Sequence, residues 1–274
     1  MKAALLQMTS GIDPAGNAAT LVDDIREAAA NGAAMVFAPE MAGLLDRDRA
    51  RAAAKLVAEA DDPVLAAVRR AAAATGLWVH LGSLAVRTTD GRLANRGFVI
   101  DGAGDVRARY DKMHLFDVDL PTGESWRESA SYQAGDEAVA VDTPVGRLGL
   151  SICYDLRFPD LYRSLTNAGA TVLAVPAAFT RPTGAGHWHV LLRARAIEAG
   201  AWVVAAAQTG THENGRATYG RSLVVDPWGE VVLDMGEAAG LAYANVDPAR
   251  VAEVRARIPA LAHRRPISPA RVAA

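Results

Sequence analysis

Strand-like and helical segments alternate along almost the whole of this 274-residue chain. Residues 3–8 and 33–38 are apolar runs of strand length, and residues 17–30 between them repeat apolar side chains at helical spacing. Three further strands are expected to follow one another as a meander, at residues 77–86, 92–100 and 106–112. This mixture of βα units and a meander predicts an α/β protein with stacked sheets flanked by helices, folded as one domain.

The same pattern continues to the end of the chain, without a repeat, a low-complexity tract or a linker. Later strands are expected at residues 139–142, 147–152, 171–175, 201–207, 219–226, 230–233 and 241–246. Helices are expected at residues 47–60, 63–75, 159–169 and 188–199. Residues 113–136 lack a clear period and are predicted to form a loop.

Composition and charge exclude several classes of function. The chain has 29 lysines and arginines against 31 aspartates and glutamates, a balance that offers no electrostatic footprint for nucleic acid or an anionic membrane. Its single cysteine cannot form an internal disulfide, so folding needs no oxidising compartment. No apolar run reaches the length of a membrane span, and the first one is too short for a signal-peptide core. We therefore expect a soluble, cytoplasmic protein.

That single cysteine, Cys153, lies between the strand at 147–152 and the helix that Pro159 opens. The junction is at the carboxyl edge of a sheet, where α/β proteins place their sites, and helix-end amides there favour a thiolate. The alternative is that Cys153 is a small buried apolar side chain, as most lone cysteines are.

Two charged residues also follow strands directly. Glu40 comes just after the strand at 33–38, and Lys112 ends the strand at 106–112. A thiol, a carboxylate and an ammonium at one edge are what acyl transfer needs: a nucleophile, a proton acceptor and a cation that faces the oxyanion. The alternatives are a solvated loop carboxylate for Glu40 and a surface cation paired with Asp111 or Asp117 for Lys112.

Three stretches around these residues resemble the signatures of the nitrilase (carbon–nitrogen hydrolase) superfamily. They are residues 37–40 (Phe-Ala-Pro-Glu), 110–117 (Tyr-Asp-Lys-Met-His-Leu-Phe-Asp) and 152–159 (Ile-Cys-Tyr-Asp-Leu-Arg-Phe-Pro). The resemblance covers essentially the whole chain. It implies a four-layer αββα sandwich over residues 1–274, an irregular C-terminal tail at 259–274, a homodimer and no cofactor.

The resemblance also implies roles for individual residues. Glu40 would be the general base, Lys112 would stabilise the tetrahedral intermediate, and Cys153 would form a thioester. The backbone N–H of Tyr154 would complete the oxyanion hole. Glu128 matches a second glutamate of many members, which would orient Lys112 or the substrate amide; the alternative is an ion pair with Arg127.

Four later stretches are most similar to the deaminated-glutathione amidase branch of this superfamily, namely residues 183–188, 205–210, 217–222 and 263–266. The resemblance to this branch implies a small-molecule amide substrate whose acyl half ends in an α-keto carboxylate. Arg157 is the candidate for bidentate binding of that carboxylate, and Thr183 is a candidate hydroxyl donor nearby. The alternative for Arg157 is a pair with Asp155 or Asp160.

Other functions stay open at this point. The chain could be an ω-amidase acting on 2-oxoglutaramate, or another amidase or carbamoylase. From a different class, Cys153 could be a redox-sensing thiol, although no second cysteine is present to resolve a sulfenic acid. His114 and His187 have no partners at metal-ligand spacing, so no metal is expected.

Overall fold

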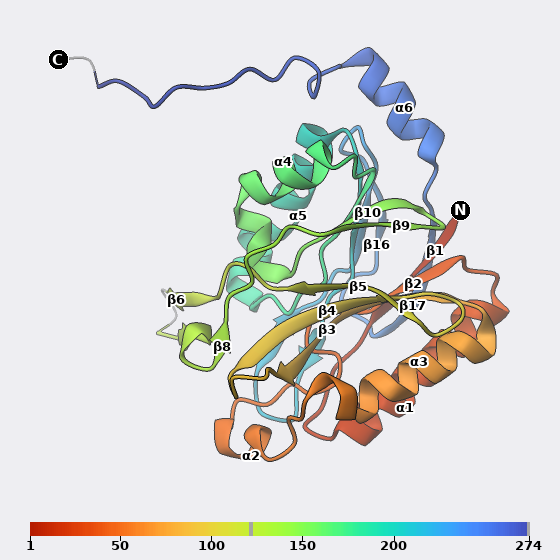
Figure 1. Ribbon diagram of the computed structural model, residues 1–274, viewed down its shortest axis with the longest axis vertical. Coiled ribbons are helices and arrows are strands. Elements are labelled where there is room, and N and C mark those ends of the chain that lie inside the picture. The colour runs from red at the N-terminus through yellow and green to blue at the C-terminus, as the bar shows by residue number, and fades with distance from the viewer. Residues whose placement is uncertain (121–122, 273–274) are drawn as a thin grey trace.

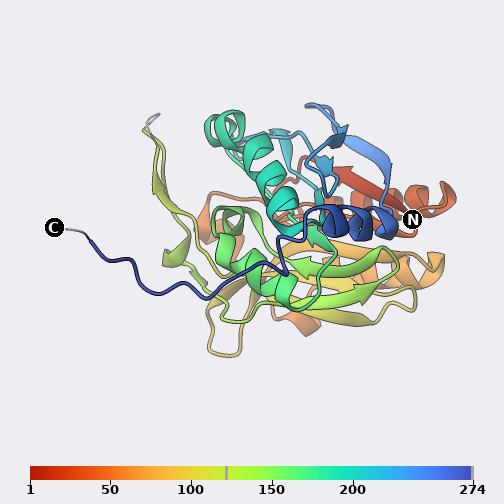
Figure 2. The ribbon, with the colours of Figure 1, turned by 90° about the horizontal axis from the view of Figure 1, so that it is seen from above.

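Two β-sheets are stacked face to face, and helices cover the outer face of each (Figures 1 and 2). The computed structural model describes residues 1–120 and 123–272. The first sheet has seven strands in the order β17-β1-β2-β3-β4-β5, with β8 paired to β4. These strands are β1 (Lys2–Gln7), β2 (Met35–Phe37), β3 (Trp78–Arg87), β4 (Leu93–Ile100), β5 (Val106–Asp111), β8 (Tyr132–Gln133) and β17 (Gly240–Asn245).

The second sheet has six strands in the order β16-β15-β12-β11-β10-β9. They are β9 (Ala140–Thr143), β10 (Gly146–Leu150), β11 (Val172–Ala174), β12 (Trp202–Ala205), β15 (Leu223–Val225) and β16 (Val231–Asp234). Two small hairpins lie outside the sheets, formed by β6 (Asp117–Asp119) with β7 (Ser125–Arg127) and by β13 (Thr209–Thr211) with β14 (Ala217–Tyr219).

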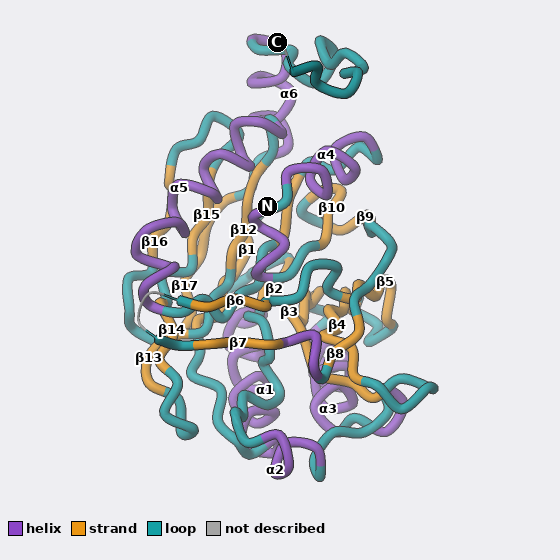
Figure 3. The backbone as a smooth tube through the Cα atoms, turned by 90° about the vertical axis from the view of Figure 1, so that its left-hand side faces the viewer, coloured by secondary structure: helices purple, strands orange, loops and turns teal. Residues whose placement is uncertain are grey.

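Six helices accompany the sheets in the described ranges. Figure 3 shows how they are placed around the strands. They are α1 (Pro14–Ala30), α2 (Arg49–Ala53), α3 (Pro63–Thr75), α4 (Pro159–Asn167), α5 (Arg181–Ala199) and α6 (Pro248–Arg257). Short 3₁₀ turns occur at Glu59–Asp61, Glu128–Ala130 and Cys153–Arg157. None of the helices described is long and apolar enough to cross a membrane.

The four layers follow from the alternation of apolar side chains along strands that are buried on both faces. In β1, Ala3 and Leu5 belong to the core shared by the two sheets, whereas Ala4 and Leu6 pack with apolar side chains of α1 and α3. The first sheet is therefore covered by α1 and α3, and the second by α4 and α5. This arrangement confirms the predicted αββα sandwich.

The helix predicted at residues 47–60 is wrong. Only α2 forms, with Asp48 as its N-cap, and the chain then turns toward β3. The backbone N–H of Arg87 donates to the carbonyl of Val57 at 2.8 Å, and Ala58 forms a bridge with Arg87. This tertiary pairing overrides the helix propensity of the alanine-rich run.

Two other boundaries differ from the predictions. Helix α5 begins at Arg181 rather than at residue 188, because Pro182 suits a first helical turn and Gly184 is a packing site. A Cβ atom at Gly184 would lie 2.2 Å from Cγ of Tyr219, so the glycine allows close contact. The predicted loop at 113–136 contains β6, β7 and β8, and its residues 121–122 lie outside the described residues.

The C-terminal segment leaves the sandwich after α6, a helix that the sequence analysis missed. Beyond it the chain runs away from the sheets (Figure 1), and Ile267 is 87% exposed. The Arg264 guanidinium contacts the body, where it donates to Oδ1 of Asn167 at 2.8 Å and to the hydroxyl of Thr166 at 3.1 Å. The last residues of the predicted tail, 273 and 274, lie outside the described residues.

Candidate active site

A cavity of about 600 Å³ lies beside the ends of several strands, and Glu40, Lys112 and Cys153 all line it. Glu40 follows β2, Lys112 follows β5 and Cys153 follows β10 by a few residues each. Although 113 residues separate the first of them from the last along the chain, the folded sheets bring all three to one place. The structure thus brings together the three side chains that the sequence singled out.

Cys153 stands on a sharp turn between strand and helix. Its φ angle is 51°, in the left-handed region that residues with a side chain seldom adopt. Such a conformation costs on the order of 1–3 kcal/mol, and the surrounding contacts hold it. One of them is the hydrogen bond from the Cys153 N–H to the carbonyl of Pro176 at 2.9 Å. The turn directs the thiol into the cavity wall, where the residue is 7% exposed.

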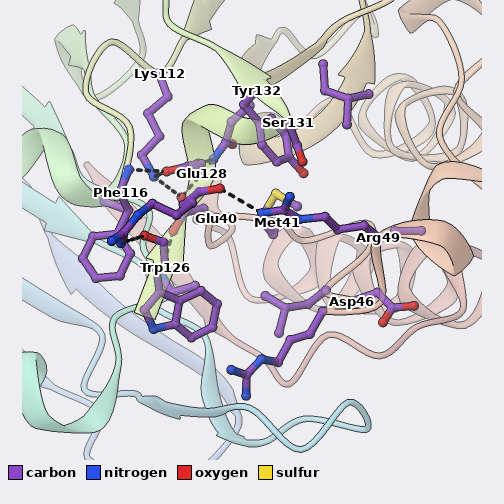
Figure 4. Close-up of a pocket in the computed structure, with 18 of the residues that line it drawn as sticks. Glu40, Met41, Asp46, Arg49, Lys112, Phe116, Trp126, Glu128, Ser131 and Tyr132 are labelled. Atoms are coloured by element: carbon purple, nitrogen blue, oxygen red, sulfur yellow. Dashed lines mark hydrogen bonds and ion pairs between the residues drawn. The ribbon is translucent and has the colours of Figure 1, made fainter. Parts of the chain in front are cut away.

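Lys112 is held between two carboxylates, as the dashed lines in Figure 4 show. Its ammonium nitrogen lies 2.9 Å from Oε1 of Glu40 and 2.8 Å from Oε2 of Glu128. The alternative partners are engaged elsewhere: Asp111 pairs with Arg96, and Asp117 accepts from Ser129. Likewise Arg127 pairs with Asp119 and not with Glu128.

Glu40 is fixed by donors that the sequence analysis missed. Its Oε2 accepts the backbone N–H of Ala178 at 2.9 Å, and its Oε1 accepts Nδ2 of Asn95 at 3.0 Å. Asn95 also donates to Glu128 at 3.1 Å and therefore bridges the two carboxylates that flank Lys112. No motif around Asn95 or Ala178 marks them, since one lies within β4 and the other acts through its backbone.

Burial and mutual contact set the charge states of the three groups. Burial alone would raise the pKa of Glu40, but the charge of Lys112 and the hydrogen bond from the Cys153 thiol hold that pKa below its ordinary 4.5. Burial alone would lower the pKa of Lys112, yet the two carboxylates raise it well above 10.5. Burial and the nearby Glu40 charge raise the pKa of Cys153 well above 9.0.

The resting site therefore holds a carboxylate, an ammonium and a neutral thiol. The expectation that helix-end amides favour a thiolate at Cys153 is wrong, because desolvation and the Glu40 charge outweigh them. A neutral thiol in the same cavity as a carboxylate base can give up its proton at the moment of attack.

Arg157 and Thr183 also line the cavity. The Arg157 guanidinium lies 3.2 Å from Nδ1 of His187 and forms no ion pair with Asp155 or Asp160. Thr183, in the first turn of α5, shares a hydrogen bond with the hydroxyl of Thr180 at 2.8 Å. The alternative partners considered for Arg157 are thus not used, and its charge faces the cavity.

The aromatic wall of the cavity includes Tyr154, whose ring meets Phe116 and Phe158 edge to face, with centroids 5.1 and 5.4 Å away. Two further lining residues, Trp126 and Arg216, carry no recognisable motif and were missed. The structure shows no grouping of histidine, cysteine and carboxylate side chains that could hold a metal ion among the residues it covers.

Comparison with known protein families shows to which family this chain belongs. The family model described as carbon-nitrogen hydrolase matches residues 2–256. The chain belongs to this family. The predicted resemblance is confirmed, and this carbon–nitrogen hydrolase is an enzyme that cleaves an amide C–N bond.

Individual relatives of this hydrolase agree with that membership. It is 38% identical to the deaminated glutathione amidase of Yersinia enterocolitica, over 97% of this chain and 93% of that protein. It is 41% identical to the deaminated glutathione amidase of Homo sapiens, over 96% of this chain and 82% of that protein. In structure it is similar to the C. elegans NitFhit protein, with a TM-score of 0.89 and 40% identity over 96% of this chain. The match spans 65% of the NitFhit chain.

Proposed function

We propose that this carbon–nitrogen hydrolase cleaves deaminated glutathione to 2-oxoglutarate and cysteinylglycine through a thioester on Cys153. The observation that carries the proposal is the hydrogen-bonded pair of Glu40 and Lys112 in one cavity with the neutral Cys153 thiol. The choice of substrate is supported by the relatives named deaminated glutathione amidase, which match nearly the whole chain.

In the first half of the reaction the Cys153 sulfur attacks the amide carbon while Glu40 accepts the thiol proton. The carbonyl oxygen gains negative charge beside the Lys112 ammonium and the backbone N–H of Tyr154, which together act as the oxyanion hole. Glu40 then returns the proton to the leaving nitrogen as the C–N bond breaks. Cysteinylglycine departs as the amine, and the acyl group stays on sulfur as a thioester.

The second half releases the acid. Glu40, again a carboxylate, accepts a proton from a water molecule that attacks the thioester carbon. The C–S bond breaks, the sulfur takes the proton back, and 2-oxoglutarate leaves. Because the pKa of Glu40 lies below 4.5, it stays ready to act as a base throughout the neutral range.

Glu128 acts in this scheme as a positioning residue. Its Oε2 holds the Lys112 nitrogen at 2.8 Å and also accepts the backbone N–H of Phe116 at 2.7 Å. The ammonium is thereby fixed at one point of the cavity, where it meets the developing oxyanion. Arg157 and Thr183 bind the α-keto carboxylate of the acyl half, for which a guanidinium free of carboxylate partners is suited.

A homodimer is part of the proposal. An exposed apolar group lies on α5 and the β15–β16 hairpin, formed by Val190, Ile197, Trp228, Val231 and Val232. The hairpin turn meets the helix here, because a Cβ at Gly229 would lie 2.6 Å from the Ile197 side chain. Such a patch is typical of protein–protein contact. We take residues 1–274 as one catalytic domain, with the tail at 259–274 crossing to the partner subunit.

The remaining parts of the proposal follow from composition. The single cysteine supports a cytoplasmic enzyme, and the near-balanced charge supports one that uses no nucleic acid or membrane partner. Since the thiol, carboxylate and ammonium supply the nucleophile, the base and the cation, the reaction needs no cofactor. A redox-sensing role for Cys153 is less well supported, because its raised pKa disfavours the thiolate on which oxidation depends.

The test combines turnover with mass spectrometry. Purified enzyme is given deaminated glutathione, 2-oxoglutaramate and a carbamoyl amino acid, and kcat/KM is measured for each. Deaminated glutathione should be preferred, and rapid acid quench should trap a mass increase of one acyl group that Cys153→Ala lacks. Higher kcat/KM for 2-oxoglutaramate would assign an ω-amidase instead. Turnover by Cys153→Ala at the parental rate would contradict the thioester.

A further inference from the structure

Three side chains without a role in the scheme above meet in the cavity wall. The guanidinium carbon of Arg47 lies 4.8 Å from the centre of the Trp126 ring, and that of Arg216 lies 4.7 Å from it. They come from separate segments, namely the loop before α2, strand β7 and the tip of the β13–β14 hairpin. All three line the same cavity as Cys153. The fold thus gathers two positive charges around one indole.

Neither guanidinium is neutralised by a carboxylate within ion-pair distance in the part of the chain that the structure describes. The nearby acids are engaged: Asp46 pairs with Arg51, and Glu128 pairs with Lys112. Burial lowers the pKa of Arg216 below its usual value. The charges of Glu40 and Glu128 oppose this effect, and the positive charge of Arg47 adds to it. Two adjacent cations in a partly buried wall favour the binding of an anion.

Hydrogen-bond donors at this place are also unused. Arg216 donates through a terminal nitrogen to the carbonyl of Ala178, but its Nε is buried and has no partner among the described residues. The indole Nε1 of Trp126 is likewise buried and without a partner there. A buried donor that stays unpaired is unfavourable, and an acceptor group of a ligand would supply the missing partner.

The guanidinium donors indicate the class of anion. A guanidinium placed over an aromatic ring can keep N–H groups of its edge free for a planar partner. Carboxylates fit that edge with two parallel hydrogen bonds. The group formed by Arg47, Trp126 and Arg216 is therefore suited to a carboxylate.

We propose that Arg47, Trp126 and Arg216 form a subsite for the terminal carboxylate of the leaving amine, which in deaminated glutathione is the glycine carboxylate of cysteinylglycine. This inference rests on the proposed function, because it names what recognises the second half of the same substrate. Arg157 and Thr183 take the carboxylate at the acyl end. A substrate with a carboxylate at each end needs two cationic places, and a cavity of about 600 Å³ is within the usual size for such ligands.

The subsite explains a choice between substrates. Release of ammonia from a primary amide leaves this group without a ligand, whereas release of cysteinylglycine uses it. The binding energy of the remote carboxylate can then position the scissile amide over Cys153. Enzymes with this group should favour amides whose amine half ends in a carboxylate.

The experiment compares deaminated glutathione with two of its derivatives, one amidated at the glycine carboxylate and one at the acyl-end carboxylate. Values of kcat/KM are measured for the native enzyme and for Arg47→Gln. Arg47 is exposed, so the variant should fold, and its melting temperature checks this. In the native enzyme, glycine amidation should lower kcat/KM about tenfold or more, as expected for loss of a charged hydrogen bond. In Arg47→Gln the same glycine amidation should lower kcat/KM by only about twofold or less.

Arg70→Gln is the control, because Arg70 on α3 is an exposed arginine outside the cavity lining. It should retain the native penalty for glycine amidation. The inference is overturned if glycine amidation lowers kcat/KM as much in Arg47→Gln as in the native enzyme. It is also overturned if Arg47→Gln instead reduces the effect of amidating the acyl-end carboxylate.

A second measurement keeps the two proposals apart. Calorimetric titration with cysteinylglycine should give a dissociation constant about tenfold higher for Arg47→Gln than for the native enzyme. If the native enzyme hydrolyses none of the three amides, the proposed function fails. If it hydrolyses them and the two proteins bind cysteinylglycine equally, only the subsite fails.

Discussion

The hydroxyl of Tyr110 donates to Oδ2 of Asp155 at 2.7 Å, and both side chains are buried. Tyr110 lies two residues before Lys112 at the end of β5, and Asp155 lies two residues after Cys153. The same Asp155 oxygen accepts the backbone N–H of Ile152 at 2.8 Å. One carboxylate therefore ties the strand that carries the ammonium to the turn that carries the thiol.

Loss of this tie should reduce stability and activity together. In Tyr110→Phe the buried Asp155 carboxylate loses a donor, so the free energy of unfolding should fall by about 1–3 kcal/mol in urea titration. Because the spacing between Lys112 and Cys153 loosens, kcat should fall as well. Tyr243→Phe is the control, since its hydroxyl has no partner among the described residues, and it should change stability by less than ~0.5 kcal/mol. Equal losses of unfolding free energy in the two variants would show that the Tyr110–Asp155 hydrogen bond has no special role.

The second prediction concerns the carboxylate pair around Lys112. Glu128→Gln removes one of the two negative charges that raise the pKa of Lys112, so that pKa should fall and the basic limb of the pH–rate profile should move to lower pH. We expect kcat to fall about 10–100-fold, because the ammonium is less firmly placed for the oxyanion.

Glu124→Gln is the charge-matched control for that variant, four residues earlier and outside the cavity lining. Its pH profile should match that of the native enzyme. A Glu128→Gln enzyme with a lower kcat but an unmoved basic limb would mean that Glu128 has a structural role only.

The third prediction is a broad pH plateau. As pH falls, the base is lost only when Glu40 takes up a proton, and its lowered pKa places that event below 4.5. As pH rises, the Cys153 thiol and the Lys112 ammonium keep their protons beyond 9.0 and 10.5 respectively. We therefore expect kcat/KM to be nearly constant from about pH 6 to 8. An acid limb centred between those values would contradict these charge states.

The fourth prediction separates the acyl-end contact from general effects. Arg157→Ala should raise KM for α-keto-acid amides about 10–100-fold, because a bidentate guanidinium–carboxylate contact is lost. Simple amides without that carboxylate should be affected far less. Arg163→Ala, an exposed arginine on α4 outside the cavity lining, is the control. Similar increases of KM for both kinds of amide would remove Arg157 from the substrate site.

Local sequence patterns predicted most of the sheets, because apolar alternation and turn residues act over a few positions. The meander of β3, β4 and β5 is confirmed to within about a residue at each end. The local patterns predicted the wrong secondary structure where contact with a distant segment of the chain determines it. Residues 57 and 58 follow an alanine-rich run with helix propensity, but they pair with β3. Two glycines early in α5 masked its start in the sequence, and one of them, Gly184, is needed for close contact with Tyr219.

For the site, the sequence by itself determined which chemistry is present: Glu40, Lys112 and Cys153 each follow a strand, and strand ends gather at the edge of a sheet. Only the tertiary structure decided how these groups are charged and held. Ala178, 138 residues from Glu40, supplies one of its hydrogen bonds, and burial keeps the thiol neutral. Desolvation and contacts between distant segments depend on the packed fold, so no local pattern encodes them.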